Sequence, residues 1–189
     1  MGVKNLDYRY SNWVISLHWL TLLLLTIIYA SMELRGFAPK GSELRDSLKS
    51  LHFLLGLCVL LVVVIRIGVR WQSGAMPGIQ PPMAAWQARL ASLMHYALYA
   101  FMMGMPLLGW LALSAKGRPI VLFGLPVPSL ISPNEPLSRQ LKEMHETLAT
   151  VGYFLIGLHA AAALVHHYVL HDNTLVRMLP GRRSSQEFK

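Results

Sequence analysis

The chain has 189 residues, of which 54% are hydrophobic, and 17 lysines and arginines against 9 acidic residues give it a formal net charge of +8. A soluble domain of this size does not hide so much apolar surface, which excludes a water-soluble globular protein. The basic residues lie around apolar stretches, where lipid headgroups are their expected partners, so the charge does not indicate nucleic-acid binding.

Four apolar stretches follow one another along the chain, and each is long enough to cross a membrane. A helix of about 20 residues spans a hydrocarbon core about 30 Å thick and satisfies its own backbone hydrogen bonds there. The first stretch follows the basic residues Lys4 and Arg9, as in a signal peptide, but it is too long for the apolar part of one. We therefore predict an all-α integral membrane protein, a four-helix bundle with helices at about 13–32, 51–71, 92–115 and 148–170.

Two longer connecting segments are not predicted to cross the membrane. Residues 72–82 are rich in turn formers, and residues 116–136 carry five prolines. The second segment also contains an apolar run over 120–125, so we expect it to lie on the membrane interface and to cap the helices. The whole chain, 1–189, is predicted to form one domain.

The orientation of the chain is predicted from its loops. Four crossings place both termini on the same side, and cytoplasmic loops usually carry the excess of lysine and arginine. Here the basic residues divide almost evenly, with a slight excess on the side of the termini. On this count we expect cytoplasmic termini.

Five of the eight histidines fall within or at the edges of the apolar stretches: His18, His52, His95, His145 and His159. Ionisable residues inside a membrane are costly and mark functional sites. His145 and His159 are 14 residues apart, which places them on nearly the same helix face and about 21 Å apart along the axis. They therefore lie at two depths of the same membrane.

The alternating direction of the helices supplies a partner at each depth. His18 should lie level with His159 on the side of the termini, and His52 should lie level with His145 on the opposite side. Two neutral imidazoles that face each other across a bundle can bind a haem iron from both sides. The sequence therefore predicts a bundle that encloses two haems.

Other interpretations of the histidines remain open. Each one alone could form a hydrogen bond between helices, belong to a proton path, or bind a transported metal ion. His95 is a third candidate at the level of His18. His166, His167 and His171 form an HHxxxH run like those of membrane di-metal enzymes, but such enzymes need several clusters with carboxylates. We expect this run to lie at the interface.

Several segments together resemble the bacterial cytochrome b561 family: ISLHW, MELRGF, LHFLLG, MHETLATVGYFLIGLHAAAALVHHY and DNTLVRMLP. This family is related to the haem b subunits of membrane formate dehydrogenases and nickel hydrogenases. The resemblance implies a four-helix bundle of the bacterial inner membrane with two haems b and cytoplasmic termini. It also implies that His18, His52, His145 and His159 are the axial ligands of the two haem irons.

Members of the family that act alone resemble superoxide oxidases, which pass electrons from superoxide at the periplasmic face to ubiquinone. An iron with two histidine ligands has no open position, so its chemistry is electron transfer through the porphyrin edge. Lys49 and Lys142 each precede a proposed outer ligand by three residues and could attract superoxide. His166 and His167 could deliver protons to the quinone on the other side.

The resemblance also permits a different function, a membrane anchor that relays electrons for a dehydrogenase or hydrogenase partner. The loops are short and carry no addition that suggests an obligate docking platform. We therefore expect a free-standing superoxide:ubiquinone oxidoreductase whose partners are membrane lipid, quinone and superoxide.

Overall fold

The computed structural model describes residues 9–74, 77–122 and 124–180. Both ends of the single domain predicted over 1–189 therefore lie outside the described residues. Within them, four helices are long and apolar enough to cross a membrane: α1 (Asn12–Phe37), α2 (Glu43–Gln72), α3 (Ala85–Ala115) and α4 (Glu135–Tyr168). The predicted all-α membrane bundle is confirmed.

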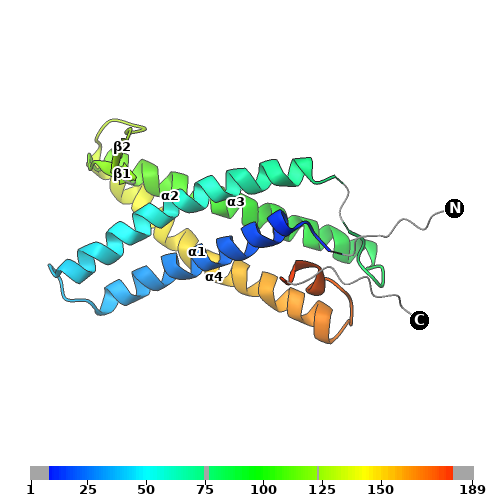
Figure 1. Cartoon of the computed structure of the whole chain (residues 1–189). Coiled ribbons are helices and arrows are strands. Elements are labelled where there is room, and N and C mark those ends of the chain that lie inside the picture. The colour runs from blue at the N-terminus through cyan, green and yellow to red at the C-terminus, as the bar shows by residue number, and fades with distance from the viewer. Residues whose placement is uncertain (1–8, 75–76, 123, 181–189) are drawn as a thin grey trace.

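Successive helices run in opposite directions, so that α1 begins and α4 ends at the same end of the bundle (Figure 1). We call this the terminal end and the opposite one the outer end. Helix α1 packs on α2, α3 packs on α4, and α2 contacts α3. Val59, Val63 and Met102 form the centre of the core between α2 and α3.

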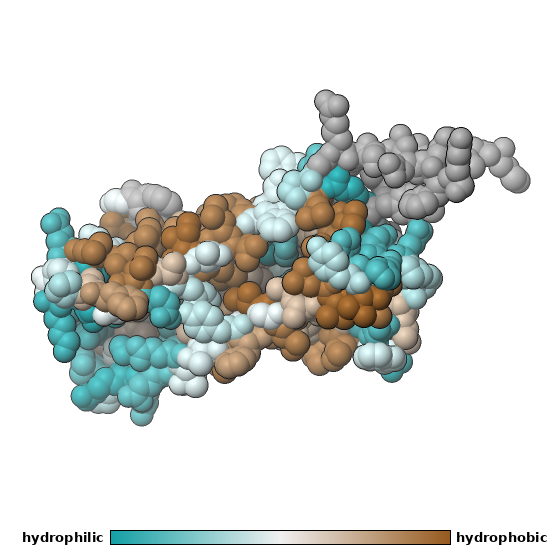
Figure 2. Space-filling view, turned by 90° about the horizontal axis from the view of Figure 1, so that it is seen from below, coloured by the Kyte–Doolittle hydropathy of each residue, from teal (hydrophilic) through white to brown (hydrophobic). Residues whose placement is uncertain are grey.

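The surface of the bundle is apolar over its middle. Large hydrophobic side chains are exposed on all four helices, among them Leu23, Leu61, Leu107 and Phe154. Figure 2 shows hydrophobic residues spread along the length of the molecule, with hydrophilic residues gathered toward both ends. This distribution suits a protein whose sides face lipid and whose ends face headgroups and water.

Three helices, α2, α3 and α4, start well before the apolar stretches predicted. Helix α2 begins after Ser42, whose side chain accepts a hydrogen bond from the backbone N–H of Arg45, and α4 begins after Asn134, which caps Leu137 in the same way. Such caps satisfy the unpaired N–H groups of a first turn. Helix α4 has 34 residues and is about 51 Å long, so its polar first turns extend beyond a hydrocarbon core of about 30 Å.

The segment between α3 and α4 folds over the outer end of the bundle. It contains a short antiparallel hairpin of β1 (Ile120–Leu122) and β2 (Leu125–Val127), and β1 contacts α2. The indole of Trp110 donates to the Pro128 carbonyl at 3.0 Å, and the Leu130 N–H donates to the Ser114 hydroxyl at 3.1 Å. These bonds hold the segment against α3, as a cap.

A 3₁₀ turn, η1 (Val176–Met178), closes the terminal end. The indole of Trp19 on α1 donates to the Met178 carbonyl at 2.7 Å. This bond fixes the segment after α4 against α1. The bonded residue of α1, Trp19, directly follows His18.

At Gly152, side chains of α1 and α3 lie directly against the backbone of α4. A Cβ atom at this position would meet the Tyr29 hydroxyl and the Phe101 ring, and the same hydroxyl donates to the Ala149 carbonyl at 2.8 Å. We expect Gly152→Ala to destabilise the protein by about 1–3 kcal/mol, because overpacking forces side chains or backbone to shift. Thermal unfolding in detergent measures this change.

Gly68→Ala is the matched control, because a Cβ atom there has nothing within 4 Å. It should leave the unfolding temperature nearly unchanged. Equal unfolding temperatures for the two variants would contradict the tight packing at Gly152.

Candidate functional site

The structure brings the four predicted ligands together in two pairs at two depths. The ring centroids of His18 on α1 and His159 on α4 are 6.3 Å apart. Those of His52 on α2 and His145 on α4 are 6.0 Å apart. Helix α4 therefore contributes one histidine to the pair near each end of the bundle.

These separations fit a metal ion held between two imidazoles. A metal–imidazole bond is about 2 Å long, and two such bonds in line with two rings separate the ring centroids by about 6 Å. In the described residues no hydrogen bond joins the two rings of either pair, and no group of three or more histidine, cysteine or acidic side chains could hold a metal ion. Each pair therefore offers two imidazoles, a donor set that fits a haem iron.

The surroundings of the outer pair suit a ligand role. The His145 ring is buried beside the backbone of Met105 on α3, and Gly109 of α3 lets that helix approach the ring, since a Cβ there would lie 3.4 Å from its Cε1 atom. The Nδ1 atom of His52 lies 3.5 Å from the Ile28 carbonyl, which can only accept. That orientation leaves Nε2 of His52 available to a metal.

His95 lies beside the inner pair, so the structure gathers three histidines there. Its ring centroid is 5.4 Å from that of His159, and its Nδ1 atom donates to the Ala91 carbonyl at 2.6 Å. His95 is exposed, whereas His18 is half-buried inside the bundle. This difference in burial favours His18 as the partner of His159.

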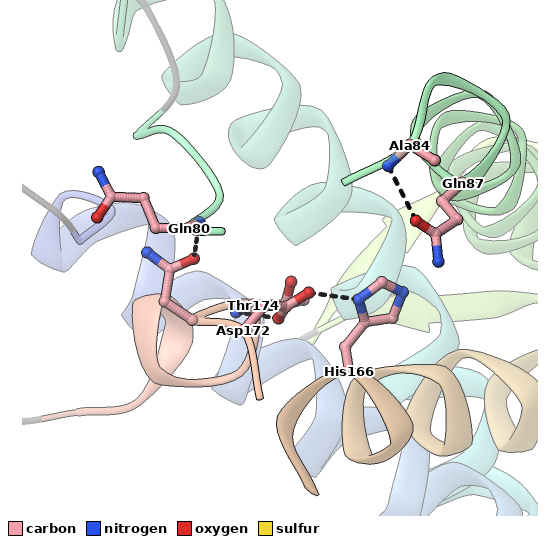
Figure 3. Close-up of polar contacts among 7 residues, drawn as sticks. Gln80, Ala84, Gln87, His166, Asp172 and Thr174 are labelled. Carbon is pink, nitrogen blue, oxygen red and sulfur yellow. Dashed lines mark hydrogen bonds and ion pairs between the residues drawn. The ribbon is translucent and has the colours of Figure 1, made fainter. Parts of the chain in front are cut away.

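His166 forms a polar pair with Asp172 at the terminal end (Figure 3). Its Nδ1 atom is 2.5 Å from Asp172 Oδ2, and the other carboxylate oxygen accepts the Thr174 N–H at 2.8 Å. Burial raises the pKa of Asp172, but the hydrogen bonds from His166 and Thr174 outweigh burial and leave the pKa below its usual value. The carboxylate is therefore ionised near neutral pH and orients the imidazole.

Sequence reasoning missed Asp172, because it lies beyond the end of α4, after a reversal of the chain. His171 has a positive φ of 54°, and the Asp172 N–H then donates back to the His166 carbonyl at 3.0 Å. Asn173 continues the turn and bonds Gln80, which ties the segment between α2 and α3 to this site. The available signal was the Asp-Asn pair, which favours turns.

The other predicted site residues lie in different settings. The ring of His167 packs against Tyr168, with centroids 4.7 Å apart, and not against His166. At the outer end, the Lys49 amino group lies 5.7 Å from the centre of the Phe53 ring. The Lys142 amino group pairs with Glu146 at 2.7 Å.

Lys49 belongs to a basic group at the outer end. Arg118, Arg35 and Lys116 all lie within electrostatic range of its amino group, and Asp46 is an acidic neighbour. These residues come from α1, α2 and the segment after α3. The fold thus concentrates positive charge beside the outer histidine pair. Lys49 lies one helical turn before His52, the member of that pair on α2.

Comparison with known proteins gives consistent matches over most of the chain. A sequence model of the family described as prokaryotic cytochrome b561 matches residues 9–181. Cytochrome b561 homolog 1 of Escherichia coli (strain K12) is 42% identical over 175 residues, which cover 93% of this chain and 99% of that protein. Probable superoxide oxidase CybB of Yersinia pestis is 40% identical over 175 residues, covering 93% and 98%. Cytochrome b561 homolog 2 of Escherichia coli (strain K12) is 29% identical over 197 residues, covering 98% of each.

Proposed function

The chain belongs to the prokaryotic cytochrome b561 family, and from this premise we propose that it is a di-haem superoxide:ubiquinone oxidoreductase of the bacterial inner membrane. The observation that carries the proposal is the presence of two histidine pairs at two depths of one bundle. The relative named as a probable superoxide oxidase, matched over nearly its whole length, supports the choice of substrate. No specific observation favours a relay subunit for a dehydrogenase or hydrogenase.

In this proposal His52 and His145 hold the outer haem b, and His18 and His159 hold the inner one. When bound between these histidines, each haem would supply one-electron transfer. His145 and His159, which would each hold one of the two groups, lie about 21 Å apart along the axis of α4. The apolar side chains between the two levels exclude water from the path of the electron.

At the outer end, the basic group around Lys49 draws superoxide toward the outer haem. Superoxide is an anion, and a cluster of positive charge raises its local concentration and its rate of encounter. Each superoxide gives up one electron and leaves as dioxygen. Lys142 adds to the same field, but its ion pair with Glu146 offsets much of its charge.

At the terminal end, His166 supplies protons to ubiquinone. It lies seven residues after His159, two turns further along the same face of α4 and about 10 Å away along the axis. Two electrons from two superoxide anions, together with two protons, convert ubiquinone to ubiquinol. Asp172 accepts a hydrogen bond from the imidazole and holds it in one orientation. His167, the next residue along the helix, is the second proposed proton donor. In this proposal the terminal end of the bundle, where both histidines lie, faces the cytoplasm.

The test uses the purified, haem-loaded protein alone, with a steady source of superoxide and a soluble ubiquinone analogue. We expect superoxide to disappear faster than by spontaneous dismutation, with one quinol formed for every two superoxide anions consumed. Protein that retains both haems but forms no quinol from superoxide would contradict the proposal.

Lys49→Gln is expected to lower the second-order rate constant for superoxide by up to about tenfold, because it removes a charge from the basic group at the outer end. The remaining rate should depend less on salt. Stopped-flow reduction of the haems by superoxide measures both effects.

Arg89→Gln is the control, because it removes an equal charge from an exposed position at the terminal end. It should leave the rate constant unchanged. A similar loss in both variants would show that only net charge matters, and would remove Lys49 from the proposal.

A further inference from the structure

Arg66 occupies a special position on α2. It follows His52 by 14 residues, the same spacing that separates His145 from His159 on α4. This spacing corresponds to about 21 Å along the axis and nearly the same helix face. Arg66 therefore stands at the inner histidine level, on the face of α2 that carries a proposed ligand at the outer level.

The contacts of Arg66 place its guanidinium beside the inner pair. Its Nη1 atom donates to the hydroxyl of Thr21 at 3.1 Å, and Thr21 follows His18 by three residues on α1. The guanidinium also lies 5.5 Å from the centre of the Tyr99 ring, four residues after His95 on α3. It is within electrostatic range of both His18 and His159.

Within the described part of the chain, the side chains that Arg66 contacts are neutral. Thr21 is 3% exposed, and its hydroxyl donates to the Leu17 carbonyl at 2.6 Å, so the oxygen turns its lone pairs to the guanidinium. Among the described residues, the ion pairs join other side chains, and none joins a carboxylate to Arg66. A charged arginine inside a membrane bundle is costly unless an anion accompanies it.

We propose that Arg66 binds a propionate carboxylate of the inner haem and raises the midpoint potential of that haem. The proposal rests on the two-haem arrangement proposed above. A reduced haem carries one more negative charge than an oxidised haem, so a nearby guanidinium stabilises the reduced form. The charge of Arg66 thereby makes electron transfer from the outer haem to the inner one more favourable. Thr21 and Tyr99 position the guanidinium for this role.

The test is a spectroelectrochemical titration of the haem-loaded protein, in which neither superoxide nor quinone takes part. We expect Arg66→Gln to lower the midpoint potential of the inner haem and to leave that of the outer haem unchanged. The two haems are assigned with the His145→Ala variant, which should retain only the inner one. The result does not depend on the electron donor or acceptor, so it stands apart from the test of the proposed function.

Arg70→Gln is the matched control, one turn further along α2. Its guanidinium donates to the Gly74 carbonyl at 3.1 Å, in an exposed bond near the helix end. Both potentials should be unchanged in this variant. An unchanged inner haem in Arg66→Gln, or an equal shift of both haems, would overturn the proposal.

A second measurement separates a propionate from a lipid phosphate as the anion. With haem labelled with ¹³C at the propionate carboxyls, the redox infrared difference bands of the label should move in Arg66→Gln and not in Arg70→Gln. Bands that stay in place would overturn the proposal and leave lipid phosphate as the partner of Arg66.

If Arg66→Gln loses the inner haem, its potential cannot be measured, and the Arg66→Lys variant is used to test the proposal instead. Lysine keeps the charge but lacks the planar fork of arginine. A retained inner haem with a potential near that of the wild type supports the proposal, and loss of the inner haem here too overturns it.

Discussion

Replacement of His145 by alanine is expected to lower the haem content of the purified protein from two haems per chain to one. His145 and His52 face each other at 6.0 Å between ring centroids, and the structure provides no other histidine at the outer level within the described residues. We expect an iron that loses one of its two proposed histidine ligands not to be retained through purification. Haem quantified per chain, with a reduced-minus-oxidised visible spectrum, measures the loss.

The remaining haem of the His145→Ala variant should keep the low-spin spectrum of an iron with two histidine ligands, because the inner pair lies about 21 Å away. His52→Ala should give the same loss, since the loss of either histidine of the outer pair should remove the same haem. His167→Ala is the control and should retain two haems, because its ring packs against Tyr168 and not against either pair. Unchanged haem content in His145→Ala, or a colourless wild type, would refute the ligand assignment and revive a transport or structural role for the histidines.

The second large effect is expected at the inner level, where both His18 and His95 lie beside His159 and are candidates for the second ligand of the proposed haem. His18→Ala should lose the inner haem, and His95→Ala should retain both. His18 is half-buried inside the bundle and faces His159 at a centroid distance of 6.3 Å. His95 is exposed, and its Nδ1 atom is bound to the carbonyl of the preceding turn of its own helix.

The same haem quantification distinguishes the two assignments. If His95→Ala loses a haem and His18→Ala keeps both, the inner iron is held by His95 and His159, and the outer pair is unaffected. A loss in both variants would mean that His95 is needed to hold His159 in place, since their rings are in edge contact.

Much of the architecture could be predicted from the sequence, because lipid imposes simple rules. A segment that crosses the membrane must be apolar and helical, so the four spans are visible in the composition alone. The polar starts of α2 and α4 were not predicted, because they extend into the headgroup region, where composition gives no signal. Ser42 and Asn134 fix those starts through local hydrogen bonds.

The candidate sites were predicted unevenly. The histidine pairs could be predicted because each member lies on a long regular helix, where spacing fixes both face and depth. The partner of His166 could not be predicted, because Asp172 reaches it only through the reversal of the chain at His171. The basic group around Lys49 draws on three separate segments, and spacing within one helix does not reveal it.

The sequence by itself determined the four spans, their alternating direction and the two depths of the histidines, since these depend only on lipid and on the rise and turn of one helix. The tertiary structure alone decided which side chains meet across helices: Arg66 with Thr21, His166 with Asp172, and both His18 and His95 with His159. Those contacts depend on how each helix is rotated and tilted against its neighbours. Small differences in packing set these angles, and the periodicity of a single helix does not encode them.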